Sequence, residues 1–174
     1  MNGFENDADM KIVGNERPAP PDTAAKWQQQ KACGNIDRAH RLGAVLAQQL
    51  MNIDEPDAAR LLQKQMLAAF VVDDALPALV PEELLTKTVR GTFYERLRDL
   101  LPEFEDTLHR LGAFTFYRLS VDGDTPDAAR VGAVFAALCG CAEDTETEQE
   151  GARLYRGYHE RLAETVAMVD FQKV

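Results

Sequence analysis

The sequence lacks the short motifs that mark many catalytic and nucleotide-binding sites. Ser120 is its only serine and no G-x-S-x-G turn is present; a glycine-rich phosphate loop and an H-E-x-x-H zinc motif are also absent. Asp122-Gly123-Asp124 lacks the later ligands of a calcium loop and predicts a turn. Because no pattern points to a nucleophile or a substrate, the sequence favours a non-enzymatic protein over an enzyme.

Cysteines, long apolar runs and clustered positive charge are also scarce. Three cysteines are an odd number for a disulfide framework, so Cys139 and Cys141 are interpreted as small buried side chains rather than metal ligands. The longest apolar stretches, such as residues 66–72, fall far short of the roughly 20 residues that span a bilayer. Lys and Arg number 19 against 29 Asp and Glu, and the resulting net charge of −10 repels phosphate groups. We therefore expect a cytoplasmic protein that binds neither nucleic acid nor membranes.

Residues 1–21 are polar, include prolines at positions 18, 20 and 21, and show no hydrophobic periodicity. They predict a disordered tail, and they lack the basic start and apolar run of a secretory signal. From Asp22 the sequence is rich in Ala, Gln, Leu, Glu and Arg, and its Val and Ile never alternate as in strands. We predict a single all-α domain over residues 22–174, a compact helical bundle. The expected helices cover about 23–33, 35–51, 54–76, 81–100, 103–120, 126–140 and a last segment ending near 168.

Three short sequence motifs, called words below, occur twice and in the same order. Asp-x-Pro-Asp-Ala-Ala-Arg occupies residues 54–60 and 124–130, and His-Arg-Leu-Gly-Ala occupies residues 40–44 and 109–113. The third word is looser and relates residues 90–97 to residues 156–162. Such ordered self-similarity predicts an internal duplication. We expect two tandem three-helix repeats, at about 35–101 and about 102–168, that share one core.

The word Asp-x-Pro-Asp-Ala-Ala-Arg has the composition of a helix start. Its first Asp, or Thr125 in the second copy, can cap the helix, and its second Asp suits the positive end of the helix dipole. Arg60 and Arg130 each follow the second Asp by three residues, within reach on the same helix face. The word therefore predicts architecture rather than an anion site. Gly43 and Gly112, expected in mid-helix beside alanines, predict tight helix crossings.

The proposed duplication also aligns residue types that bind metals. Two Asp-x-x-His pairs and two single glutamates match the ligand count of di-iron carboxylate bundles. The residues are Asp37, His40, Glu95, Asp106, His109 and Glu160. Asp is one methylene shorter than the usual Glu, and arginines stand beside the set, so a histidine held by a carboxylate is the simpler interpretation. A metal-binding protein or metal-dependent enzyme with a transition metal is our alternative hypothesis; otherwise we expect no cofactor.

Our first hypothesis is a helical module that binds another protein or a small ligand, and the amphipathic build is compatible with a homodimer. A further hypothesis is an anion pocket built from arginines of both copies. These arginines are Arg41, Arg60, Arg90, Arg110, Arg130 and Arg156. Phe114, Phe116 and Tyr117 are too close together to share one helix face, so at least one should point outward or toward a partner.

Overall fold

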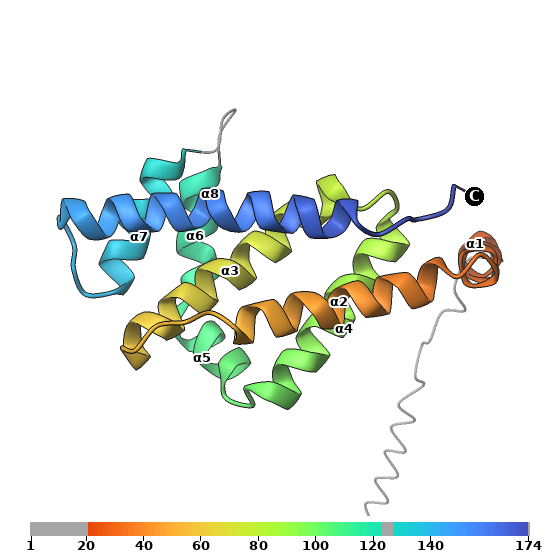
Figure 1. Cartoon of the computed structure of the whole chain (residues 1–174), viewed down its shortest axis with the longest axis horizontal. Helices are drawn as coiled ribbons and strands as arrows, with labels where there is room; N and C mark the ends of the chain where they lie inside the picture. The colour runs from red at the N-terminus through yellow and green to blue at the C-terminus, as the bar shows by residue number, and fades with distance from the viewer. Residues whose placement is uncertain (1–20, 123–126, 174) are drawn as a thin grey trace, which may run out of the picture.

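A computed structural model describes residues 21–122 and 127–173, and within these ranges the chain forms helices and no strands (Figure 1). Residues 1–20 of the predicted 1–21 tail and residues 123–124 of the predicted turn lie outside the described ranges, whereas Pro21 begins a helix. None of the helices described is long and apolar enough to cross a membrane. The all-α prediction is confirmed. The helices are α1 (Pro21–Ala32), α2 (Asn35–Met51), α3 (Ala58–Leu79), α4 (Glu83–Leu100), α5 (Phe104–Leu111), α6 (Ala113–Val121), α7 (Ala128–Leu138) and α8 (Thr145–Ala167).

Helix α3 forms the centre of the bundle. Its sequence is apolar around the whole circumference from Met66 to Val72, and every side chain of that stretch is buried. The helix contacts α2, α4, α6, α7 and α8, and Figure 1 shows α8 running across it. These five helices therefore pack around α3 and share its core.

Helix α3 continues through Pro77 to Leu79, although the sequence predicts an end before this proline. Proline has no N–H group, so the carbonyl of Asp73, four residues earlier, loses its helical partner. The Arg90 guanidinium of α4 donates a 3.1 Å hydrogen bond to that carbonyl, and Arg90 Nε lies 3.0 Å from the Asp73 carboxylate. A side chain from a neighbouring helix thus replaces the missing backbone bond.

Glycines allow two pairs of helices to cross closely. A β-carbon at Gly43 of α2 would lie 2.5 Å from the Val89 carbonyl oxygen of α4, and one at Gly132 of α7 would lie 2.2 Å from the Glu148 carbonyl oxygen of α8. The crossing predicted at Gly43 is confirmed. The matching prediction at Gly112 is wrong, because this residue has φ +61° and separates α5 from α6 instead of continuing one helix.

Both copies of Asp-x-Pro-Asp-Ala-Ala-Arg begin a helix, as predicted. The capping residue is the second aspartate of each copy: Asp57 accepts a 2.7 Å bond from the Arg60 N–H, and Asp127 accepts a 2.9 Å bond from the Ala129 N–H. The prediction of the first aspartate or Thr125 as cap placed the helix start three or two residues too early. Arg130 Nε lies 3.6 Å from Asp127, as expected, whereas the Arg60 guanidinium turns away from Asp57 toward α8.

The two predicted repeats pack differently. In the first repeat the most extensive contact joins α2 to α4, whereas in the second it joins α7 to α8. The first helix of the second repeat is also divided at Gly112. The helical bundle is therefore confirmed, but the internal duplication is not.

Helix α6 carries aromatic side chains on two faces. Tyr117 is fully buried, with its ring centroid 5.3 Å from that of Phe70 in α3. Phe116 is 51% exposed and Leu119, three residues later, is 64% exposed. The prediction that one of the neighbouring aromatics points outward is confirmed.

Candidate functional site

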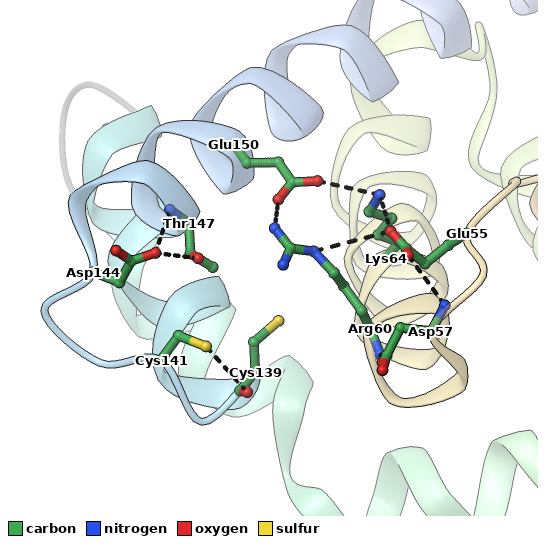
Figure 2. A network of polar contacts seen from close by, with 9 residues as sticks. All are labelled: Glu55, Asp57, Arg60, Lys64, Cys139, Cys141, Asp144, Thr147 and Glu150. Atoms are coloured by element: carbon green, nitrogen blue, oxygen red, sulfur yellow. Dashed lines mark hydrogen bonds and ion pairs between the residues drawn. The ribbon is translucent and has the colours of Figure 1, made fainter.

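Four charged side chains connect the beginning of α3 to α8 (Figure 2). Arg60 and Lys64 both contact the Glu150 carboxylate, Lys64 at 3.1 Å, and Lys64 Nζ lies 2.5 Å from Glu55 in the preceding loop. Arg60 Nε lies 3.9 Å from the same Glu55 oxygen. The four side chains are between 12% and 35% exposed. They form a closed network, the ionic network, in which each charge faces an opposite one.

The start of α8 is fixed by its own cap, which sets the position of Glu150. Asp144 accepts a 3.0 Å bond from the Thr147 N–H and a bond from the Thr147 hydroxyl. These two bonds lower the pKa of Asp144. Since Glu150 lies in the second turn after this cap, the capped turn directs its carboxylate toward α3.

The ionic network holds its groups in their charged forms. The hydrogen bond from Lys64 lowers the pKa of Glu55. Burial alone would raise the pKa of Glu150, but hydrogen bonds from Arg60 and Lys64 outweigh it and the pKa is lowered. Burial alone would lower the pKa of Lys64, but its bonds to the two glutamates outweigh it and the pKa is raised. Paired carboxylates with lowered pKa values are poorly suited to exchange protons near neutral pH, so we assign the network a stabilising role.

Cys139 and Cys141 lie at the end of α7, beside the ionic network (Figure 2). Burial raises the pKa of the Cys139 thiol to about 11, which keeps it protonated and weakly nucleophilic at neutral pH. Cys141 is exposed, and its Sγ lies 3.7 Å from the Cys139 carbonyl oxygen. Cys139 is half-buried, which agrees with its interpretation as a small packed side chain, whereas Cys141 does not fit that interpretation.

The predicted metal ligands lie on four helices. His40 Nδ1 is 2.7 Å from the Thr92 hydroxyl of α4, so its ring is held by a hydroxyl rather than by the expected carboxylate. No three His, Cys, Asp or Glu side chains within the described residues form a group that could hold a metal ion. The side chain of His109 lies outside the described residues. The other five are exposed at the surface: Asp37, His40, Glu95, Asp106 and Glu160.

Half of the predicted anion-binding arginines already have anionic partners. Arg60 contacts Glu150, Arg90 contacts Asp73, and Arg130 contacts Asp127. An incoming anion would have to displace these carboxylates. Arg41 and Arg156 are exposed on α2 and α8, and the side chain of Arg110 lies outside the described residues.

An apolar groove lies between the start of α3 and the junction of α4 with α5. One wall is a stripe along α3 with the spacing i, i+3, i+4, i+7, formed by Ala58, Leu61, Leu62 and Gln65. The opposite wall is formed by residues 100–104 and by Thr107. The groove has a volume of about 540 Å³, and Leu100 on its edge is 43% exposed. A stripe with this spacing is suited to pack against another element, and here Ala58 is exposed and Leu61 and Leu62 are only partly buried, whereas Gln65 is buried.

Other depressions of the surface differ from this groove in size or in chemistry. One of about 550 Å³ between α1 and α4 is lined largely by polar side chains, including Glu82 and Lys87. One of about 370 Å³ beside α2 and the end of α8 combines Met168 with Arg41. A cavity between α2, α3 and α8 measures only about 30 Å³, close to the space of a single water. The α3–α4–α5 groove therefore combines a large volume with apolar walls.

Sequence reasoning missed both the ionic network and the groove. Arg60 and Glu150 are separated by 90 residues, so no local pattern could pair them. The α3 stripe has a recognisable spacing, but spacing alone does not show whether a neighbouring helix covers it.

No protein-family model matches the chain, and neither a curated protein nor a solved structure is significantly similar to it. The functional assignment therefore depends on the geometry of the chain itself.

Proposed function

We propose that this chain is a helical protein-binding module and that the α3–α4–α5 groove is its binding surface. The observation that carries this proposal is the partly exposed stripe of Ala58, Leu61 and Leu62, which faces the partly exposed Leu100 across the groove. Burial of apolar surface is the main favourable contribution to most protein association. A partner segment that fills the groove would remove both leucine-bearing walls from water.

A protein segment suits the groove better than a small ligand. Small-molecule sites enclose most of their ligand and direct a few polar groups at it. Here four of the ten lining residues are leucines, and the walls are the side of α3 and the junction of α4 with α5. Such grooves are typical of helix-in-groove recognition, in which apolar side chains of a partner helix supply the anchors.

Site-specific photo-crosslinking in cells that make the protein tests the proposal. A benzophenone amino acid is introduced in place of Leu100 in the groove, and in a matched control in place of Leu119, which is exposed on α6. We expect a discrete protein adduct from position 100 and none from position 119. The crosslinked protein, once identified and purified, should bind the wild-type chain at least about tenfold more tightly than the Leu100→Glu variant. Absence of an adduct, or the same adduct from both positions, would refute the proposal.

A further inference from the structure

Four acidic residues lie in the lining of the groove or directly before a lining residue in the sequence. Glu103 lines the groove itself, Asp57 directly precedes Ala58, Asp99 directly precedes Leu100, and Asp106 directly precedes Thr107. All four acidic side chains are exposed. We call these four residues the acidic rim.

Among the described side chains, the basic residues near the groove compensate only part of this charge. Arg96 lies 4.0 Å from Asp99 and pairs with it, and Arg98 is already engaged in an interaction within the chain. Arg60 and Lys64 belong to α3, but at 100° per residue they lie on the side opposite the groove wall, where they contact Glu150. Neither of them therefore neutralises the acidic rim.

On the basis of the proposed function, we infer that the groove binds a basic amphipathic helix of a partner protein. Apolar side chains of that helix enter the groove, and its Lys and Arg side chains lie over the acidic rim. The α3 stripe spans eight residues, Ala58 to Gln65, whose seven steps of 1.5 Å cover about 10 Å, so about two turns of the partner contribute anchors. Each exposed ion pair adds little affinity, but together the charges select the partner and accelerate association.

The same charges disfavour the other occupants of an apolar groove. A two-fold symmetric homodimer through this surface would bring one acidic rim against its copy, which is repulsive. Nucleic acids and anionic membrane surfaces are repelled for the same reason. A partner helix with acidic side chains beside its apolar face would meet the same repulsion.

Selection from a displayed peptide library tests the inference. The probes are peptides of about 18 residues, long enough to form a helix, with leucines fixed at i, i+3, i+4 and i+7. All other positions are randomised equally among Lys, Arg, Glu, Asp, Gln and Ala. Peptides are selected on the full-length wild-type chain and depleted on the Leu100→Glu variant, whose helical folding is first verified by circular dichroism.

We expect the enriched peptides to contain at least about three times as many Lys and Arg as Asp and Glu. Their binding should weaken about tenfold or more with Leu100→Glu and by less than about twofold with the control Leu119→Glu. The paired substitution Glu103→Gln and Asp106→Asn changes only exposed groups, and its helical folding is verified in the same way. It should weaken binding about two- to tenfold and reduce the salt dependence.

Three outcomes would overturn the inference, and they differ in what they mean for the proposed function. Enriched peptides that are neutral or acidic, yet lost with Leu100→Glu, would refute the basic partner and leave the groove as the binding surface. A wild-type dimer that Leu100→Glu dissociates in sedimentation would show that a second copy occupies the groove. Failure to enrich any groove-dependent peptide would exclude a helical partner, and the crosslinking from position 100 would then decide the proposed function separately.

Discussion

The close crossing of α7 and α8 predicts opposite effects for two Gly→Ala substitutions. A β-carbon at Gly132 would lie 2.2 Å from the Glu148 carbonyl oxygen, whereas one at Gly91 of α4 would meet no atom within 4 Å. Both glycines lie within helices, where alanine is favoured by about 1 kcal/mol. Ordinary contacts begin near 3.4 Å, so Gly132→Ala forces the two backbones more than 1 Å apart.

The magnitude of the effect depends on how far the neighbour can move. Overpacking a core costs about 1–3 kcal/mol, and the upper end applies here because the obstructing atom belongs to the backbone. After subtraction of the helix propensity, Gly132→Ala should lower the free energy of unfolding by about 2 kcal/mol. The control Gly91→Ala should raise it by up to about 1 kcal/mol. For a chain of this size the corresponding changes in melting temperature are a decrease of about 4–8 °C and an increase of about 2–4 °C.

Urea and thermal unfolding, both monitored by helical circular dichroism, measure these changes. Gly91→Ala reports the gain from helix propensity alone, so the difference between the two variants isolates the crossing. If Gly132→Ala were as stable as the wild-type chain, or more stable, while Gly91→Ala behaved as expected, the described crossing of α7 and α8 would be refuted.

Polar groups give three further predictions. Burial lowers the pKa of His159 below 6.5 despite the opposing effect of an acidic neighbour, so protonation favours the unfolded chain. The urea midpoint should therefore fall as the pH drops from about 6.5 to 5. His159→Gln should remove this dependence of the urea midpoint on pH. Glu150→Gln should lower the free energy of unfolding by about 1–2 kcal/mol, because Arg60 and Lys64 then share one carboxylate. The difference should decrease as the pH falls below the ordinary glutamate value of 4.5 and vanish only below the lowered pKa of Glu150, where the wild-type carboxylate is protonated as well. Asn35→Ala should speed amide hydrogen exchange at Gln172, because the fully buried Asn35 side chain accepts a 2.9 Å bond from that N–H.

The sequence predicted those features of the fold that are determined by residues close together in the chain. Helix propensity and periodicity act locally, which explains why the all-α class and a helix start in each copy of Asp-x-Pro-Asp-Ala-Ala-Arg could be predicted, although the caps, Asp57 and Asp127, lie two or three residues later than predicted. The continuation of α3 through Pro77 could not, because it depends on Arg90 from another helix. The end of α5 at Gly112 was missed because a glycine in a helical pattern is compatible with either a close crossing or a left-handed turn.

Repeated words are weaker evidence for packing than for local structure. Asp-Ala-Ala-Arg starts a helix in both copies, yet Arg130 stays with Asp127 while Arg60 contacts Glu150 of α8. The same four residues thus make different tertiary contacts in the two copies. The predicted set of metal ligands depended on the two copies packing alike. In the described packing the two copies make different helix contacts, so equivalent residues of the copies do not occupy equivalent positions.

The ionic network and the groove occupy opposite sides of the same two turns of α3. Arg60 and Lys64 attach these turns to α8, while Leu61 and Leu62 form the groove wall. A wall held in place before binding loses less conformational entropy when a partner arrives. Glu150→Gln should therefore weaken the binding of the enriched basic peptides to the groove about two- to fivefold, although Glu150 does not line the groove. Isothermal titration calorimetry would measure this loss, with Glu148→Gln as the control on the same helix. Equal peptide affinity of both variants would show that the α3 wall keeps its position without the network.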